Sequence, residues 1–573
     1  MESFPAQNEG LTQTLEDDPA LGLPIRAKME ILFAVLLGLF LGALDQTIVG
    51  PALPTIVTKL AGNDIYVWAV TIYLLTSTIS VPFWGKLSDL YGRKPMFMIG
   101  IIIFLVGSAL SGLSQNMTEL IAFRGLQGIG AGSLFPIALA VIGDLFTPAE
   151  RGKYQGLFGA VFGIAFIVGP LVGGFLTENI AWNWIFYVNI PIGLVSLYFI
   201  WRLLPTVKTA RATRNFDILG GLIFTVAISL LLVGLTEKGQ TDPATHHLYN
   251  WTDPAVGGLI LAALVGIALF IGAELRAKEP IVPLQLFRNR TYAASMVATF
   301  FAAFAFFGAI IFLPRWFQIV QGFSPTWSGL AALPLMVGLI ASSIASGLIV
   351  ARTGRYKWLT VGAIALMGVS TLLMTQLRAE TPLPVVWLWM FIAGVGVGPT
   401  FAVFTLIVQN AVPFNMLGVA TSNLTFFRQI GGTVALAIVG TIFSSSLLEG
   451  IGPQLSAAGT PKPLVDGFTQ AINSGQVDFQ GLTGTGDLGQ AILANAGPAR
   501  AAIEPFIGNI VTGFHEAFSL AVAQTFWIGV GASIVAALAA AAMQELALRR
   551  TAPAAAAAGT AKESRGSAVP AAD

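Results

Sequence analysis

The stretch ILFAVLLGLFLGALDQTIVGPALPTIV, residues 31–57, is long and apolar enough to cross a bilayer, yet it contains the carboxylate of Asp45. A membrane-spanning helix needs about 20 predominantly apolar residues. A charge at the bilayer centre costs roughly 2.5 to 3.5 kcal/mol on insertion scales, so an acid retained there indicates a function. The stretch therefore predicts a membrane helix and poses the question of what Asp45 binds.

The composition of the whole chain indicates a polytopic α-helical membrane protein. Of its 573 residues, 55% are hydrophobic and 10% are charged, whereas soluble proteins carry about 25% charged residues. A net charge of +1 gives no indication of nucleic-acid binding. The chain has no cysteine, which excludes disulfides and cysteine nucleophiles. The three histidines lie near or outside the predicted membrane edge: His246, His247 and His515. We therefore expect no metal site, no catalytic residue and no enzymatic activity.

Apolar windows of about 20 residues predict the membrane spans. Fourteen are expected, near 31–57, 66–84, 95–114, 118–144, 154–176, 184–204, 217–236, 254–274, 292–314, 326–350, 358–377, 385–411, 418–445 and 516–545. An even number of spans places both termini on one side. With the termini inside, 22 of the 30 Lys and Arg residues are cytoplasmic, six are external and two lie within spans. Because Lys and Arg near span ends resist translocation, both termini are predicted to be cytoplasmic.

These spans suggest a division of the chain into domains. We expect a cytoplasmic N-terminal tail at 1–28, a six-helix bundle at 29–204, a linker with two extra spans at 205–291, a second six-helix bundle at 292–545 with an external loop at 446–515, and a disordered cytoplasmic tail at 546–573. The loop is long, and its piece PLVDGFTQAI fits either a short amphipathic helix or a flexible connection. The final tail is of low complexity.

An internal repeat links the two bundles. The stretch GKLSDLYGRK at 85–94 follows the second span, and GLIVARTGRY at 347–356 follows the tenth, with both glycines and the arginine at the same spacing. In the same order, GIGAG at 128–132 in the fourth span matches GVGVG at 394–398 in the twelfth. Together these matches predict two six-span halves with two spans inserted between them.

The depth of Asp45 in the membrane indicates its partner. Asp45 lies 14 residues from the cytoplasmic start of its span at Ile31, which is about 21 Å at 1.5 Å per residue. Arg124 lies six residues from the external start of its span, about 9 Å. In a hydrocarbon core about 30 Å thick these depths coincide, so the two side chains are predicted to meet. The pair either carries a proton through Asp45 or is a static ion pair that fixes helix packing. Glu178, at the outer end of the fifth span, is a weaker proton candidate.

The loop after the second span has features of a cytoplasmic gate. Gly85 and Gly92 permit a tight turn and a close helix approach. Asp89 can pair with a base or a helix N-terminus. Asp144 lies at the same level and is the expected partner of Arg93. The alternative is simple anchoring of the loop by its positive charges.

Deep charges are unequally divided between the halves. The repeat places Ala305 opposite Asp45 and Met390 opposite Arg124. In the thirteenth span Arg428 has no acid nearby in the sequence; its partner is a substrate, a group of backbone carbonyls or the membrane edge. In the fifth span, the glycines and proline of GIAFIVGPLVGG interrupt a helix, and close helix packing alone explains them equally well.

Five stretches carry a resemblance to the fourteen-span drug:proton antiporters of the major facilitator superfamily. They are LDQTIVGPALP, GKLSDLYGRK, RGLQGIGAG, GPLVGG and WNWIFYVNIPIG. The family's usual first motif has Asn and Val where this chain has Gly50 and Pro51, and its last has Arg where this chain has Asn183. The resemblance covers residues from about 30 to 545.

The resemblance implies specific roles. It assigns proton coupling to Asp45 and Arg124. It assigns the cytoplasmic gate to Gly85, Asp89, Gly92, Arg93 and Asp144. It assigns an antiporter hinge to Gly169, Pro170, Gly173 and Gly174. It implies a monomeric exporter of amphipathic small molecules in the bacterial inner membrane, driven by the proton gradient without a cofactor. The alternatives are an exporter of one lipid or natural product, or a membrane sensor or scaffold that has lost transport.

Overall fold

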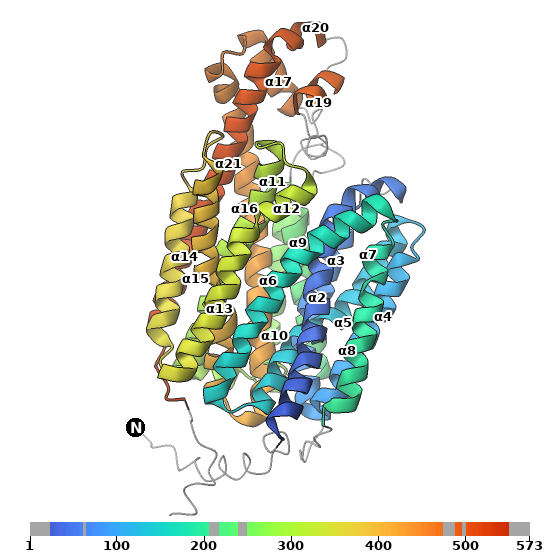
Figure 1. Cartoon of the computed structure of the whole chain (residues 1–573), viewed down its shortest axis with the longest axis vertical. Coiled ribbons are helices and arrows are strands. Elements are labelled where there is room, and N and C mark those ends of the chain that lie inside the picture. The colour runs from blue at the N-terminus through green and yellow to red at the C-terminus, as the bar shows by residue number, and fades with distance from the viewer. Residues whose placement is uncertain are drawn as a thin grey trace, which may run out of the picture.

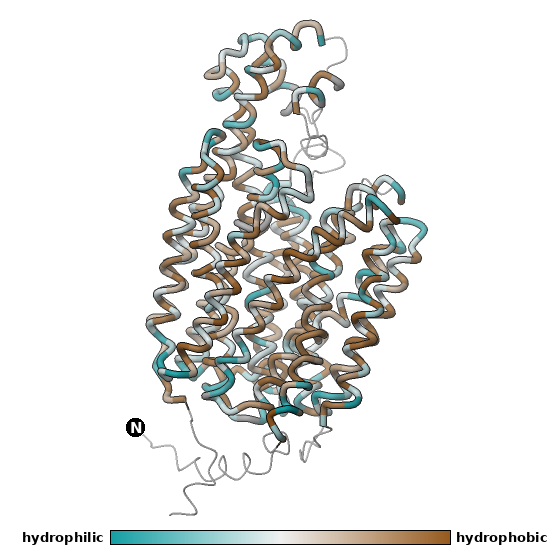
Figure 2. The backbone as a smooth tube through the Cα atoms, viewed as in Figure 1, coloured by the Kyte–Doolittle hydropathy of each residue, from teal (hydrophilic) through white to brown (hydrophobic). Residues whose placement is uncertain are grey.

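The computed structural model describes residues 23–60, 65–205, 217–238, 249–473, 488–495 and 500–548. These residues are mostly helical, and no strand occurs among them. Fourteen helices in this part of the chain are long and apolar enough to cross a membrane. This confirms the predicted all-α fold with fourteen spans. Figure 2 shows mainly apolar residues through the middle of the molecule, with polar residues collected at the helix ends.

The first six spans form one bundle (Figure 1). Its helices are α2 (Ile25–Lys59), α3 (Val67–Tyr91), α4 (Arg93–Gly112), α5 (Met117–Leu145), α6 (Pro148–Asn179), α7 (Trp184–Tyr187) and α8 (Asn189–Leu203), the last two forming one span. Local signals set the helix starts. Asn116 caps α5 by accepting a hydrogen bond from the Glu119 N–H at 2.9 Å. Thr147 and Glu150 form a capping box at the start of α6.

The two inserted spans and the second bundle follow. The insert contains α9 (Ile218–Glu237), η1 (Pro254–Gly258) and α10 (Leu259–Glu274), and η2 (Leu284–Arg288) leads out of it. The second bundle contains α11 (Arg290–Ile319), α12 (Pro325–Ala331), α13 (Leu333–Thr353), α14 (Lys357–Met374), α15 (Leu383–Asn410), η3 (Phe414–Met416), α16 (Leu417–Ala457) and α21 (Ile507–Ala542). Its helices lie beside the first bundle in Figure 1.

The packing between the bundles follows the internal repeat. Helix α3, the second span of its half, packs against α16, the fifth span of the other; α13 and α6 pack in the reciprocal way. The matching turns also agree, since Gly92 after α3 has φ 95° and Gly354 after α13 has φ 71°. Positive φ favours glycine, which explains why both repeats keep a glycine there.

A small helical cap covers the end of the second bundle opposite to the start of α2 (Figure 1). At 41 residues, α16 is about 60 Å long, twice the hydrocarbon thickness. It therefore continues past the membrane end expected near 445. At 36 residues, α21 is also longer than a span requires, and it begins at Ile507, before the expected 516. Between them lie α17 (Lys462–Asn473), α19 (Leu488–Asn495), α20 (Arg500–Ile503) and η5 (Glu504–Phe506). Of the two alternatives for PLVDGFTQAI, the structure has the helix, α17.

Some predictions fall outside the described residues. These include most of the N-terminal tail, the histidines at 246 and 247, and the tail beyond Leu548. The described chain begins and ends at the same end of the molecule, where α2 starts and α21 finishes (Figure 1). This end is the predicted cytoplasmic end, and the opposite one is the predicted external end.

Candidate functional site

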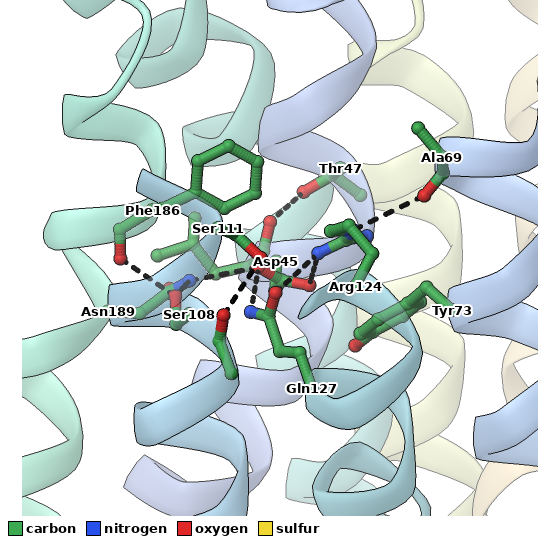
Figure 3. Close-up of polar contacts among 12 residues, drawn as sticks. Asp45, Thr47, Ala69, Tyr73, Ser108, Ser111, Arg124, Gln127, Phe186 and Asn189 are labelled. Atoms are coloured by element: carbon green, nitrogen blue, oxygen red, sulfur yellow. Dashed lines mark hydrogen bonds and ion pairs between the residues drawn. The ribbon is translucent and has the colours of Figure 1, made fainter. Parts of the chain in front are cut away.

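Asp45 lies at the centre of a buried polar cluster in the first bundle (Figure 3). Its side chain, on α2, is fully buried. One carboxylate oxygen, Oδ2, lies 2.7 Å from Nη1 of Arg124. The other, Oδ1, accepts hydrogen bonds from Gln127 at 2.8 Å and from Asn189 at 2.9 Å. The predicted pair is therefore in direct contact, and two amides complete the binding of the carboxylate.

Arg124 is held in place by several groups besides Asp45. Its Nη1 also donates to Oε1 of Gln127 at 2.9 Å, and its Nε donates to the carbonyl of Ala69 at 3.4 Å. Its guanidinium carbon lies 4.0 Å from the centroid of the Tyr73 ring, a geometry that favours a cation over an aromatic face. Helices α2, α3 and α5 are thus joined through one side chain.

Asn189 ties the sixth span to the same cluster. It is the first residue of α8, and besides Asp45 it donates to Ser108 of α4 at 3.1 Å. The Ser108 hydroxyl in turn donates to the carbonyl of Phe186 at 2.9 Å. Four of the bundle's spans therefore meet at or directly behind the Asp45 carboxylate, in addition to α3, which Arg124 reaches. Removing one partner from such a buried ion pair typically costs about 3 to 5 kcal/mol.

Sequence reasoning missed three members of this cluster. Gln127 was available, since it lies one helical turn after Arg124 on the same face. Asn189 lies within the WNWIFYVNIPIG stretch, but no spacing relates it to Asp45. Tyr73 is one aromatic residue among many apolar ones in α3. The positions of the last two depend on how the helices pack.

The gate residues cluster at the predicted cytoplasmic end and bridge the two bundles. Asp89 of α3 accepts hydrogen bonds from the backbone N–H groups of Gly418, at 3.1 Å, and Val419, at 2.8 Å. These N–H groups open α16, where the helix dipole favours a negative charge. A Cβ on Gly85 would lie 2.8 Å from the Gly418 carbonyl oxygen. The close contact between α3 and α16 therefore requires glycine at 85.

Arg93 connects this contact to the rest of the first bundle. It forms an ion pair with Asp89, and its Nε donates to Oδ2 of Asp144 at 2.9 Å. Its Nη1 donates to the hydroxyl of Ser88 at 2.7 Å. The expected Arg93–Asp144 contact is thus present, and Asp89 pairs with both a base and a helix N-terminus. Gly92 provides the positive-φ turn between these residues.

A second connection between the bundles was not predicted. Gln409 of α15 donates to the Leu139 carbonyl of α5 at 3.0 Å and accepts from Gln155 of α6 at 2.8 Å. All of these groups are buried. Nearby, a Cβ on Gly347 of α13 would lie 2.0 Å from the Gly152 carbonyl of α6. Near the predicted cytoplasmic end, the bundles are therefore in contact along α3–α16 and also where α5 and α6 meet α13 and α15.

The insert also contacts the gate loop. Nζ of Lys86 lies 2.7 Å from Oε2 of Glu279, in the segment that joins α10 to η2. Lys86 is almost completely buried. The two extra spans are thereby linked to the loop that contains Asp89.

The proposed hinge residues of α6 pack against neighbouring helices. A Cβ on Gly169 would meet the Thr47 hydroxyl at 2.0 Å, and one on Gly173 would meet the Ile48 carbonyl at 2.3 Å. Pro170 lies within α6, and Gly174 faces Thr326 near the start of α12. These contacts are close helix packing, and the hinge role stays a prediction. Glu178 is exposed at the predicted external end of α6, apart from the Asp45 cluster.

Arg428 is a residue of α16, and its side chain contacts α15. Its Nη2 donates to the carbonyl of Thr400 at 3.1 Å, and its guanidinium carbon lies 4.5 Å from the centroid of the Phe401 ring. Of the three partners considered from the sequence, a backbone carbonyl is present. Among the described residues, no group of three or more His, Asp or Glu side chains is arranged to hold a metal ion.

The family model of the Major Facilitator Superfamily matches residues 35–436. The chain belongs to the major facilitator superfamily. Multidrug transporter protein MdtP of Bacillus subtilis (strain 168) is 41% identical over 415 residues, which cover 72% of this chain and 75% of that protein. Multidrug resistance protein 3 of the same organism is 34% identical over 454 residues, covering 78% of this chain and 86% of that protein.

Solved structures of the major facilitator superfamily share the fold. The structure of the proton:xylose symporter XylE bound to 6-bromo-6-deoxy-D-glucose superimposes with a TM-score of 0.55. It is 13% identical in sequence and matches 90% of this chain and 95% of its own. At this identity the likeness concerns the fold alone, and it confirms the predicted major facilitator fold. The first relative is named as a multidrug transporter and the second as a multidrug resistance protein, and neither name is that of an enzyme.

Proposed function

We propose that the chain exports amphipathic small molecules across the bacterial inner membrane in exchange for protons. The observation that carries the proposal is the fully buried Asp45 carboxylate, bound by Arg124, Gln127 and Asn189 inside a membrane bundle. An intramembrane acid of this kind is expected to serve a transport pathway. The multidrug names of the two Bacillus relatives support drug-like small molecules as substrates. Their amphipathic character is what the resemblance to the drug:proton antiporters implies.

The contacts of Asp45 suggest how a proton changes the conformation. Protonation neutralises the carboxylate and removes its charge attraction to Arg124. Asp45 lies on α2, which packs against α6 through Thr47 and Gly169. Helix α6 packs in turn against α13 of the second bundle. A change at Asp45 is thereby transmitted to the interface between the two bundles.

Alternating access then requires the closed end to open. In this conformation Asp89 binds the start of α16, and Gln409 binds Leu139 across the interface. Opening toward the cytoplasm breaks both contacts and lets substrate enter. The proton released from Asp45 in that state regenerates the ion pair with Arg124, and the cycle repeats with both bundles moving around the central site.

The proposal extends to location and assembly. The positive-inside distribution of Lys and Arg supports a cytoplasmic position for both termini. A monomer is sufficient, because the Asp45 cluster and the gate are built within one chain. No cofactor is required, since the proton gradient supplies the energy.

The test is dye export from proteoliposomes with an imposed pH gradient. Purified protein should drive movement of an amphipathic fluorescent dye when the gradient is present. Movement should stop when a protonophore removes the gradient. Equal dye flux with and without the gradient would refute the proposed antiport.

A further inference from the structure

Arg428 is a deeply placed cation whose partners differ from those of Arg124. It lies 11 residues into α16, about 16 Å from the helix start, and so within the membrane. Among the described residues it forms one hydrogen bond, to the Thr400 carbonyl, and no ion pair. A guanidinium has five N–H donors. Arg124, in contrast, is neutralised by Asp45.

Among the described residues of the second bundle, no acid pairs with Arg428. Between residues 291 and 448 the sequence contains a single acidic residue, Glu380, and it lies in the loop between α14 and α15. The next acid, Glu449, lies 21 residues further along α16, and Glu516 of α21 pairs with Arg378. A charge left without a counter-ion in a membrane is costly, and such residues usually face a pathway or a cavity. The positive charge is therefore available to an anion that arrives from outside the protein.

Aromatic rings from both bundles gather beside Arg428. The Phe401 ring, over which the guanidinium lies, contacts Phe162 of α6 with centroids 5.2 Å apart and Phe306 of α11 at 5.7 Å. Phe166 of α6 contacts Phe306 in turn, at 6.5 Å. Phe166 and Arg428 are both only partly buried. The aromatic group thus lies where the two bundles meet, as expected for the substrate site of an alternating-access transporter.

Together these features define the chemistry of a ligand. Small-molecule sites are mostly apolar and aromatic, with a few polar groups that fix orientation. Here the aromatic rings fit a planar ring system, and the guanidinium fits a carboxylate or sulfonate, which it can bind through two N–H groups. We propose that Arg428 and the Phe166–Phe306–Phe401 group form a binding site for aromatic amphipaths that bear an acidic group. This inference rests on the proposed export function and specifies its substrate class.

A matched pair of fluorescent probes tests the inference by binding alone. The anionic probe is 8-anilinonaphthalene-1-sulfonate, and the neutral one is N-phenyl-1-naphthylamine, which has the same rings without the sulfonate. Saturable binding of both is measured on purified full-length protein, the Arg428→Gln and Arg428→Lys variants, and Arg378→Gln as a control on an exposed loop arginine.

We expect Arg428→Gln to weaken binding of the sulfonate about tenfold or more, as loss of a charge-assisted hydrogen bond predicts. The dissociation constant of the neutral probe should change by less than about twofold. Arg428→Lys should fall between the wild type and Arg428→Gln for the sulfonate, because it keeps the charge but not the planar fork. Arg378→Gln should bind both probes like the wild type. The neutral probe and the melting temperature show whether each variant is folded.

Two results would overturn the inference. One is equal weakening of both probes by Arg428→Gln in a folded protein, which would make Arg428 a packing residue. The other is unchanged binding of the sulfonate. Because binding needs no gradient, failure of gradient-driven dye export would count against the proposed antiport and leave a positive binding result standing.

Discussion

The carboxylate of Asp89, in the first bundle, accepts a hydrogen bond from the backbone N–H of Val419, in the second, at 2.8 Å. A side chain of one half therefore caps a helix of the other, and the proposed transport cycle requires this cap to break when the predicted cytoplasmic end opens. The ion pair with Arg93 keeps Asp89 oriented toward that helix start. This single contact couples the electrostatics of the gate loop to the relative position of the bundles.

Replacing Asp89 should loosen the closed end. Asp89→Asn keeps the shape of the side chain but removes the charge, which is worth about 1 to 2 kcal/mol at a helix N-terminus. In a Ser422→Cys background, the cysteine lies in the buried contact between α3 and α16. Its labelling by a maleimide from the cytoplasmic side should become several-fold faster. Glu30→Gln, which removes an exposed ion pair with Arg26, is the control, and equal labelling rates in both variants would contradict the latch.

The glycine at 85 should tolerate no side chain. Gly85→Ala places a Cβ 1.9 Å from the Ser422 hydroxyl and 2.8 Å from the Gly418 carbonyl oxygen. The bundles must separate at this contact between α3 and α16. Driven export should therefore fall at least about tenfold, the factor that corresponds to a free-energy loss of about 1.4 kcal/mol at the contact. Gly440→Ala, in α16 with nothing within 4 Å of the added Cβ, should export normally. Normal export by both variants would show that the close contact is unnecessary for transport.

Gln127 should act together with Arg124 and Asp45. Gln127→Leu removes the donor to Asp45 and the acceptor for Arg124 while keeping similar volume. Leaving buried polar groups unpaired costs about 1 to 3 kcal/mol, so the melting temperature and driven export should both decrease. Gln318→Leu, which removes a partly buried hydrogen bond to Ser328 outside the cluster, is the comparison. A larger loss of export in that variant would argue against the cluster.

The predicted orientation can be tested because the chain has no cysteine. Arg355→Cys and Arg378→Cys place one thiol at either end of α14, at positions that are both exposed. In intact spheroplasts an impermeant maleimide should label only the cysteine at position 378. The one at position 355 should react only after lysis. The reverse pattern would place the termini outside.

The sequence predicted those features that depend on one helix at a time. The spans follow from apolar length, and the depths of Asp45 and Arg124 follow from the constant rise of a helix, so their contact could be expected. The Gln409–Leu139 contact could not, because it depends on how two bundles dock. The extension of α16 was missed because it leaves the apolar window while remaining helical. Nothing in the sequence specified that Arg428 lies over Phe401, since that requires the rotation of α16 relative to α15.

The proton-coupling role of Asp45 is the central claim, and proteoliposomes measure it directly. Wild-type protein, Asp45→Asn and Glu178→Gln are reconstituted with a pH-sensitive dye inside the vesicles. Proton flux is then recorded on adding an exported substrate. The account predicts substrate-induced proton flux for the wild type and Glu178→Gln and none for Asp45→Asn. Undiminished proton flux in Asp45→Asn would contradict the account, and loss of flux only in Glu178→Gln would move the proton site to the external end of α6.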